Sequence, residues 1–334
     1  METKISVLIA ARDAAPTLAL TLESVRRQSF AAWECLIADD GSADATRDLA
    51  ADFCRRDPRF RLLPLPARGV VEARNAALAE CRGEWIALLD ADDLMRRRRL
   101  EKQAAALAAD PRLDGVGCHV RYFPRAAAGE GRGEYERWLN GFHDPEGLAL
   151  ERFVEMPVGH PTLLLRAELL REHRYRQMGW PEDWDLLLRL LGAGARIGVV
   201  AERLHAWRLR PDSLSRRSPA YSTGSFMRCR AAFLAEQWLP GVQDYVLWGY
   251  GGTGKALRAA LLEHGRIPSH IVEIHPGRIG NKIHGTPVIA PAGLRGLRGL
   301  RVVVSVAGAQ ARRIIRGAME DFGLVEGVDY VFAA

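Results

Sequence analysis

Short apolar runs alternate with other patterns along the first hundred residues. Four of these runs predict buried strands, at 5–10, 33–38, 60–65 and 84–89. Three intervening stretches predict helices, at 16–28, 44–55 and 70–81. Strands that are apolar on both faces and are separated by helices form parallel sheets covered on both sides. The pattern therefore predicts an α/β domain.

The middle of the chain is less regular, and the alternation restarts after Pro240-Gly241. The pattern of residues 121–140 predicts a loop that ends in a helix at 134–140. The pattern of residues 205–215 predicts a polar loop. The restarted pattern predicts strands at 245–248, 271–275 and 301–306 and helices at 256–264 and 311–322. Because a Pro-Gly pair suits a boundary, we expect domains at 1–240 and 241–334, the second a small α/β domain.

Acidic clusters follow two of the predicted strands at their carboxyl ends, where parallel sheets bind ligands. Asp90, Asp92 and Asp93 follow the fourth strand. Two like charges about 4 Å apart repel by about 4 kcal/mol at an effective dielectric near 20, and Mg²⁺ or Mn²⁺ would relieve that repulsion. If the segment is extended, Asp90 and Asp92 point to one side. The alternative is an acidic N-terminus of a helix at 94–107, but the position at a strand end favours a metal site.

Three further polar side chains near the predicted strand ends have both a binding and a structural interpretation. Asp39 and Asp40 can accept hydrogen bonds from a base or a ribose, or can form an Asx turn with Gly41. Arg74, on the helix after the third strand, can pair with a carboxylate or phosphate, or can be a solvated surface arginine. None of the three decides a function by itself.

The combination of these motifs resembles the family 2 glycosyltransferases of the GT-A fold. The segments that carry the resemblance are 7–13, 24–30, 33–42, 69–75, 83–93, 182–190 and 208–215, and together they span about residues 3–215. The resemblance implies an inverting, metal-dependent transfer of a sugar from a nucleotide-diphosphate donor, most simply a UDP-sugar, to a hydroxyl acceptor. We expect that acceptor to be a growing surface polysaccharide or a lipid-linked glycan.

The resemblance also implies roles at the donor end of the site. Asp39 or Asp40 would bind the nucleotide base, with Ala10 and Arg12 at the rim of that pocket. Arg74 would lie near the base and the diphosphate. Many relatives have a proline or an aromatic residue where this chain has Ala10-Ala11-Arg12-Asp13, so the resemblance does not fix which nucleotide is bound.

The remaining implied roles concern the metal and the chemistry. Asp90 and Asp92 would form the DxD element, with Asp92 the direct ligand of Mn²⁺ or Mg²⁺. Asp183, in the pair Glu182-Asp183, would be the general base, although such a pair also suits a helix N-terminus. His205 and Arg208 would close over the diphosphate, with His205 a further metal ligand.

The predicted second domain contains a glycine-rich turn, Gly249-x-Gly251-x-x-Gly254, between a strand and a helix. Glu273 lies at the end of the next predicted strand, where a ribose-binding acid would be, so the segment fits a dinucleotide-binding turn. The glycines can equally serve close packing of strand and helix. The region resembles, more loosely, Rossmann-like accessory domains of sugar-modifying enzymes, and a non-catalytic nucleotide-sugar or dinucleotide-binding regulator is therefore the alternative function.

Composition narrows the class of protein. With 48% hydrophobic and 26% charged residues among 334, bulk disorder is excluded. The charge is +6, and only four of the 47 basic residues are lysines, which fits either phosphate binding or a GC-rich genome. The arginines at 96–99 have no aromatic neighbours for stacking, so we expect no nucleic-acid partner. We interpret them as a turn of a solvated helix or as a contact to a lipid headgroup or phosphate.

Cysteine spacing and hydropathy bear on the compartment. Five scattered cysteines without a CxxC pair argue against a disulfide framework and structural zinc. The N-terminal apolar run is too short for a signal peptide, and no run of about 18 apolar residues predicts a spanning helix. We therefore expect a cytoplasmic protein, with peripheral contact at the inner face of the membrane left open.

Overall fold

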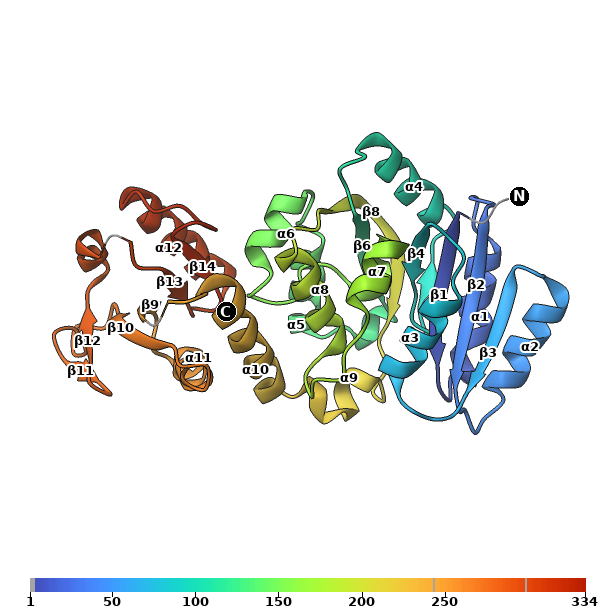
Figure 1. The fold of residues 1–334 in the computed structure, drawn as a ribbon, viewed down its shortest axis with the longest axis horizontal. Coiled ribbons are helices and arrows are strands. Elements are labelled where there is room, and N and C mark those ends of the chain that lie inside the picture. The colour runs from blue at the N-terminus through green and yellow to red at the C-terminus, as the bar shows by residue number, and fades with distance from the viewer. Residues whose placement is uncertain (1–3, 243, 298) are drawn as a thin grey trace. The chain divides into compact units, whose positions relative to one another are not determined.

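The predicted N-terminal strands lie side by side in a computed structural model, which describes residues 4–242, 244–297 and 299–334. They belong to an eight-stranded sheet (Figure 1). Its strands, in order across the sheet, are β3 (Phe60–Leu65), β2 (Trp33–Asp40), β1 (Ile5–Ala11), β4 (Trp85–Leu88), β7 (Leu164–Arg166), β6 (Gly115–Phe123), β8 (Ile197–Arg208) and β5 (Leu94–Met95). The first four are parallel, whereas β7 and β5 are antiparallel to their neighbours.

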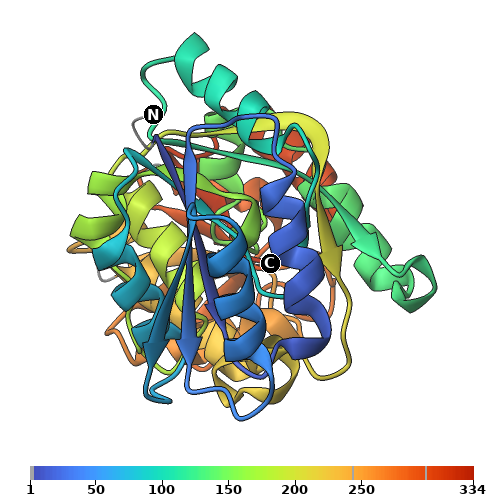
Figure 2. The ribbon, with the colours of Figure 1, turned by 90° about the vertical axis from the view of Figure 1, so that its right-hand side faces the viewer.

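Helices cover both faces of the parallel part of this sheet, as the apolar strands predicted. Side chains that alternate along β1 pack with those of α1 (Ala15–Arg26) and α4 (Arg99–Ala109) in one continuous core. Figure 2 shows α1 and α2 (Thr46–Arg56) beside the strands, and α3 (Val70–Glu80) packs on β1 and β2. The carboxyl ends of β1, β2 and β4 therefore meet at one edge, and the register places Ala11 beside Asp39.

The less regular middle contains more structure than the sequence pattern predicted. Its helices are α5 (Glu130–Leu139), α6 (Pro145–Glu151), α7 (Ala167–His173), α8 (Glu182–Gly192) and the short α9 (Leu214–Arg217). The prediction of a polar loop from residue 205 was wrong at its start, because β8 continues to Arg208. Parallel pairing of this segment with β6 as far as Phe123 accounts for the longer strand.

The C-terminal sheet has six strands, in the order β11 (Lys282–Ile283), β12 (Thr286–Ile289), β10 (Ile267–Val272), β9 (Asp244–Trp248), β13 (Val302–Val304) and β14 (Tyr330–Phe332). Neighbouring strands from β12 across the sheet to β14 pair in parallel, and β11 joins β12 as an antiparallel strand. The accompanying helices include α10 (Thr223–Phe233), α11 (Gly252–Leu262) and α12 (Ala309–Asp321). This small α/β unit confirms the predicted fold class.

Two compact units divide the described chain. Among the described residues, the first comprises 4–148, 157–178 and 182–217, and the second comprises 149–156, 179–181, 218–242, 244–297 and 299–334. The expected boundary near Pro240 immediately precedes the six-stranded sheet, whereas the second compact unit also includes 218–240 and two short segments from earlier in the chain. Those segments could not be assigned by composition, because they are defined by contacts distant in sequence.

A buried ionic cluster holds one of these early segments within the second unit. Glu151, at the end of α6, is an ion-pair partner of Arg316 and lies 3.9 Å from the Nε of Arg312. Arg316 also binds Glu326, with 2.7 Å between Nε and Oε2. Because Glu151 and Arg312 are each only 8% exposed, the cluster places charge where water cannot solvate it well.

Replacing Arg316 with methionine tests this cluster. We expect Arg316→Met to lower the free energy of unfolding by about 1–3 kcal/mol, since it leaves two largely buried carboxylates without their shared cation. Thermal melting measures the effect, with Arg313→Met as the control, because Arg313 is an exposed arginine on the same helix. Equal melting temperatures for the two variants would contradict a stabilising role.

Candidate active site

The acidic residues after β4 form a tight turn. The backbone N–H of Asp93 donates to the carbonyl of Asp90 at 3.2 Å, so the segment is a turn, and the condition of an extended segment is not met. Asp90 and Asp92 remain partly exposed, and Asp93 is buried. Burial, together with repulsion from Asp93 and Asp90, raises the pKa of Asp92 to about 7. A cation beside this turn would relieve the repulsion.

Arg74 connects the acidic turn to the beginning of α8. One of its terminal nitrogens donates to Asp90 at 3.2 Å, and the other donates to Glu182 at 2.7 Å. The guanidinium lies over the ring of Tyr175, 5.3 Å from its centroid, and Arg74 is buried. Two carboxylates that are far apart in sequence therefore share one cation. A solvated surface arginine, the structural alternative from the sequence, is excluded.

Asp183 follows Glu182 in the first turn of α8 and is partly exposed. Its Oδ1 accepts a hydrogen bond from the N–H of Trp184 at 2.8 Å. Burial and the neighbouring Glu182 raise the pKa of Asp183 to about 7, although Arg74 opposes the shift. A carboxylate with this pKa can take up a proton near neutral pH.

Asp93 and His205 form a buried layer behind the turn. The Nε2 of His205 lies 2.8 Å from Asp93 Oδ2, and its Nδ1 lies 3.1 Å from the guanidinium of Arg99. Because Arg99 can only donate, Nδ1 accepts and Nε2 carries the proton. Burial and Arg99 lower the pKa of His205 well below its usual value.

The expectation that His205 is a metal ligand does not fit this geometry. Both ring nitrogens are engaged, and the side chain of His205 is fully buried. Sequence reasoning also placed Arg99 on a solvated helix turn, whereas it is buried and binds Gln103 and the carbonyl of Leu88 as well. The apolar residues that follow Arg99 at helical spacing were the available signal that this face of α4 is buried.

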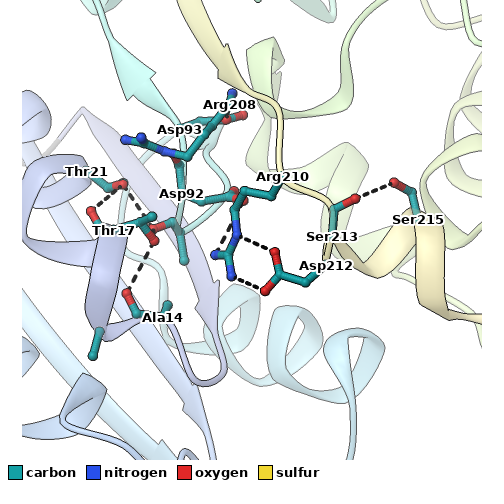
Figure 3. A network of polar contacts seen from close by, with 12 residues as sticks. Ala14, Thr17, Thr21, Asp92, Asp93, Arg208, Arg210, Asp212, Ser213 and Ser215 are labelled. Atoms are coloured by element: carbon teal, nitrogen blue, oxygen red, sulfur yellow. Dashed lines mark hydrogen bonds and ion pairs between the residues drawn. The ribbon is translucent and has the colours of Figure 1, made fainter. Parts of the chain in front are cut away.

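Two arginines from the end of β8 hold the other side of the turn (Figure 3). The backbone N–H of Arg208 donates to Asp93 Oδ1, and its Nε donates to the carbonyl of Asp92, each at 2.6 Å. Arg210 lies 3.9 Å from Asp92 Oδ2 and forms a two-pronged ion pair with Asp212. Sequence reasoning found Arg208 but missed Arg210, which brings a guanidinium close to the Asp92 carboxylate.

The carboxylates at the end of β2 are buried, and they are bound by α2 and by a neighbouring loop. Asp39 accepts from the Nε of Arg47 at 2.8 Å, and Asp40 accepts from the backbone N–H of Arg68 at 2.8 Å. Arg12, which is half-exposed, lies 3.5 Å from Asp40. Ala10, near the end of β1, is paired with the strand that carries both aspartates. The predicted base-pocket residues are therefore brought together, but guanidinium groups cover their carboxylates.

The acidic turn supplies suitable ligands for a hard divalent cation, although it supplies few of them. Among the residues that the structure describes, no group of three or more His, Cys, Asp or Glu side chains is arranged to hold a metal ion. Asp90 and Asp92 can offer carboxylate oxygens, and Mg²⁺ in particular often completes its coordination with water and substrate phosphate. The residues present therefore fit a cation that binds together with a phosphorylated ligand.

The glycine-rich turn of the second unit packs closely against the sheet. A Cβ on Gly254 would lie 2.1 Å from the carbonyl oxygen of Gly249, and Gly249 itself has a φ of +93°. These two glycines therefore allow strand and helix to approach, which supports the packing interpretation for both. A Cβ on Gly251 would meet no atom within 4 Å.

Glu273 is already engaged by the same turn. Its Oε1 accepts from the N–H of Tyr250 at 2.8 Å and from Arg278 at 2.9 Å. The carboxylate therefore fixes the conformation of the turn from the end of the next strand. Nucleotide binding by Gly249, Gly251, Gly254 and Glu273 remains a prediction.

The model of the family described as "Glycosyl transferase family 2" matches residues 6–173, which contain the acidic turn and Arg74. The chain belongs to glycosyl transferase family 2. This confirms the resemblance that the strand-end motifs suggested.

Two similar proteins illustrate the range of matches. The chain is 31% identical over 247 residues to the succinoglycan biosynthesis protein ExoO of Rhizobium meliloti, covering 71% of this chain and 70% of that protein. It is 36% identical over 104 residues to WfgD of Escherichia coli, a UDP-Glc:α-D-GlcNAc-diphosphoundecaprenol β-1,3-glucosyltransferase, covering 31% and 40% of the two chains. The chain thus has relatives in polysaccharide biosynthesis.

Solved structures confirm the fold. The S. aureus TarS fragment 1–349, crystallised with UDP-GlcNAc, has a TM-score of 0.56 at 18% identity and covers 78% of this chain and 72% of its own. The Pyrobaculum calidifontis mannosyltransferase PcManGT, in complex with GDP-Man and Mn²⁺, has a TM-score of 0.51 at 19% identity, with 79% and 70% covered. The chain therefore has the GT-A-type architecture.

Substitution of Arg74 by lysine tests the link between the two acidic segments. One ammonium group cannot reproduce the planar fork that reaches Asp90 and Glu182 together. We expect Arg74→Lys to lower the free energy of unfolding by about 1–3 kcal/mol, because a buried carboxylate loses a charged hydrogen bond. Thermal melting measures this, with the exposed Arg68→Lys as the control. Unchanged stability of Arg74→Lys would mean that the simultaneous guanidinium contact with Asp90 and Glu182 is dispensable.

Proposed function

We propose that this family 2 enzyme is an inverting, metal-dependent glycosyltransferase that uses a nucleotide-diphospho-sugar donor and a hydroxyl acceptor. The observation that carries the proposal is the bridge from Asp90 through Arg74 to Glu182, which brings a cation-binding turn and the Asp183 carboxylate into one site. Direct displacement requires a cation that stabilises the leaving diphosphate and a base that deprotonates the attacking hydroxyl, both in the same site.

The donor would bind along the carboxyl ends of β1, β2 and β4. Ala10, Arg12, Asp39 and Asp40 would surround the base, as their common strand edge suggests. We propose a UDP-sugar, since TarS was crystallised with UDP-GlcNAc and the name of WfgD specifies UDP-Glc. Because the two aspartates are covered by guanidinium groups, entry of a base requires local rearrangement of these arginines.

The diphosphate would lie at the acidic turn. Asp90 and Asp92 would hold Mn²⁺ or Mg²⁺, and the bound cation would neutralise charge on the departing diphosphate. Arg208 holds the backbone of the turn, and Arg210 lies beside Asp92. Their guanidinium groups would add positive charge where the diphosphate passes.

Asp183 would be the general base that takes the proton of the acceptor hydroxyl. Glu182 is assigned a supporting role instead, because it is buried and bound by Arg74. A single base that activates the acceptor hydroxyl fits one direct displacement with inversion.

The acceptor is assigned by class alone. We propose a growing surface polysaccharide or a lipid-linked glycan, since ExoO and WfgD are named for such products. Within the residues that the structure describes, no helix is long and apolar enough to cross a membrane. Cytoplasmic location and peripheral contact with the inner membrane face remain predictions.

A panel of nucleotide sugars tests the function and its residue roles. We expect one donor to raise the melting temperature when Mn²⁺ is present, and to be hydrolysed slowly with release of its nucleotide. Asp92→Asn should abolish the Mn²⁺-dependent shift. Asp183→Asn should keep that shift and reduce nucleotide release by about 10²–10⁴-fold, the usual contribution of a general base. Full release by Asp183→Asn would refute the base assignment.

The pH dependence of nucleotide release provides a separate test of Asp183. Its pKa is raised to about 7, and only the deprotonated carboxylate can accept a proton. With Mn²⁺ saturating throughout, kcat/KM should therefore fall about tenfold per pH unit below about pH 7. A profile that stays flat from pH 8 to pH 5 would contradict the assignment.

A further inference from the structure

The middle peptide of the acidic turn is anchored by two side chains that the proposed function does not use. The carbonyl oxygen of Ala91 accepts hydrogen bonds from the hydroxyls of Thr17, at 3.1 Å, and Thr21, at 3.0 Å. Ala91 stands between Asp90 and Asp92, so both hydroxyls bind the peptide that joins the two candidate metal ligands. Figure 3 shows both threonines on α1 facing this turn.

The geometry favours the turn over the helix as the acceptor of both hydroxyls. Each threonine also lies near a carbonyl of its own helix, but at the longer distances of 3.3 Å from Thr17 to Ala14 and 3.4 Å from Thr21 to Thr17. A hydroxyl has a single proton to donate. Because residues four apart lie on one face of a helix, α1 presents both donors to the same oxygen.

These contacts complete a set of restraints around the turn. On its other side, Arg208 donates to the carbonyl of Asp92 at 2.6 Å. Both peptide carbonyls of the Ala91-Asp92 pair are therefore held, one by α1 and one by β8. Neighbouring carboxylates repel, so an unrestrained turn would relax by moving Asp90 and Asp92 apart.

We propose that Thr17 and Thr21 are positioning residues that set the directions of Asp90 and Asp92 for the divalent cation and the donor diphosphate. The proposal rests on the proposed function, and it adds residues that touch neither cation nor substrate. Hydrogen-bonding partners behind metal ligands commonly change metal affinity by 10–100-fold when they are removed. Both threonines are buried, so water cannot replace the lost donors.

Threonine-to-valine substitutions isolate the hydroxyls, because valine keeps the shape and the β-branching. The measurement is the dissociation constant of Mn²⁺ in the presence of UDP, by isothermal titration calorimetry, without any turnover. We expect Thr17→Val/Thr21→Val to weaken Mn²⁺ binding at least tenfold, and each single variant to weaken it less. Thr17→Ser/Thr21→Ser should remain within about twofold of the wild type, because serine restores the donors.

The control is Thr286→Val in the second unit, where a buried threonine donates to the carbonyl of Pro268 at 3.1 Å. It should lower the melting temperature without changing Mn²⁺ affinity. If the double valine variant does not fold, the Mn²⁺ dissociation constants of the two single valine variants test the proposal instead. Wild-type binding that survives every valine substitution would overturn the positioning role alone. A wild-type protein that binds no Mn²⁺ with UDP would overturn the proposed function and, with it, this inference.

Discussion

The candidate site depends on one buried guanidinium. Arg74 links Asp90, which follows β4, to Glu182, which begins α8, and it lies over the ring of Tyr175. Without it, two carboxylates would face each other in a poorly solvated place, and their repulsion would separate the elements that carry them. With it, the first turn of α8, which carries Asp183, is tied to the acidic turn. The pairing thus brings residues that are widely separated in sequence into one candidate site.

The acidic turn can hold its three carboxyl groups close together because its backbone is restrained from several directions. Asp93 is fixed from behind by His205 and by the backbone of Arg208, while the hydroxyls on α1 bind the carbonyl of Ala91. These donors stabilise the turn before any ligand arrives, which is the arrangement that lowers the reorganisation cost of catalysis. The elevated pKa of Asp92 follows from its burial in the turn and, to a smaller extent, from the like charges of Asp93 and Asp90 beside it. These contacts explain physically why the turn keeps its shape.

Much of this could be predicted from the sequence, and the failures have physical causes. The strands near the N-terminus were predictable because they are apolar on both faces. The motif after the fourth strand pointed to Asp90 and Asp92, and the Glu182-Asp183 pair pointed to Asp183, whose roles remain predictions. Sequence patterns could not show that His205 is enclosed by Asp93 and Arg99, since burial of a polar cluster leaves no periodic signal. The two early segments that belong to the second unit could not be predicted either, because contacts distant in sequence define them.

The central claim is that one base deprotonates the acceptor hydroxyl, whose oxygen then displaces the nucleotide diphosphate directly from the side of the sugar opposite the acidic turn. Proton NMR of the sugar released during early hydrolysis of an α-linked UDP-sugar, before mutarotation, tests it most directly. The account predicts that the β-anomer appears first, because inversion at the anomeric carbon follows from a single displacement. First appearance of the α-anomer would require two displacements or front-face attack, and would contradict the account.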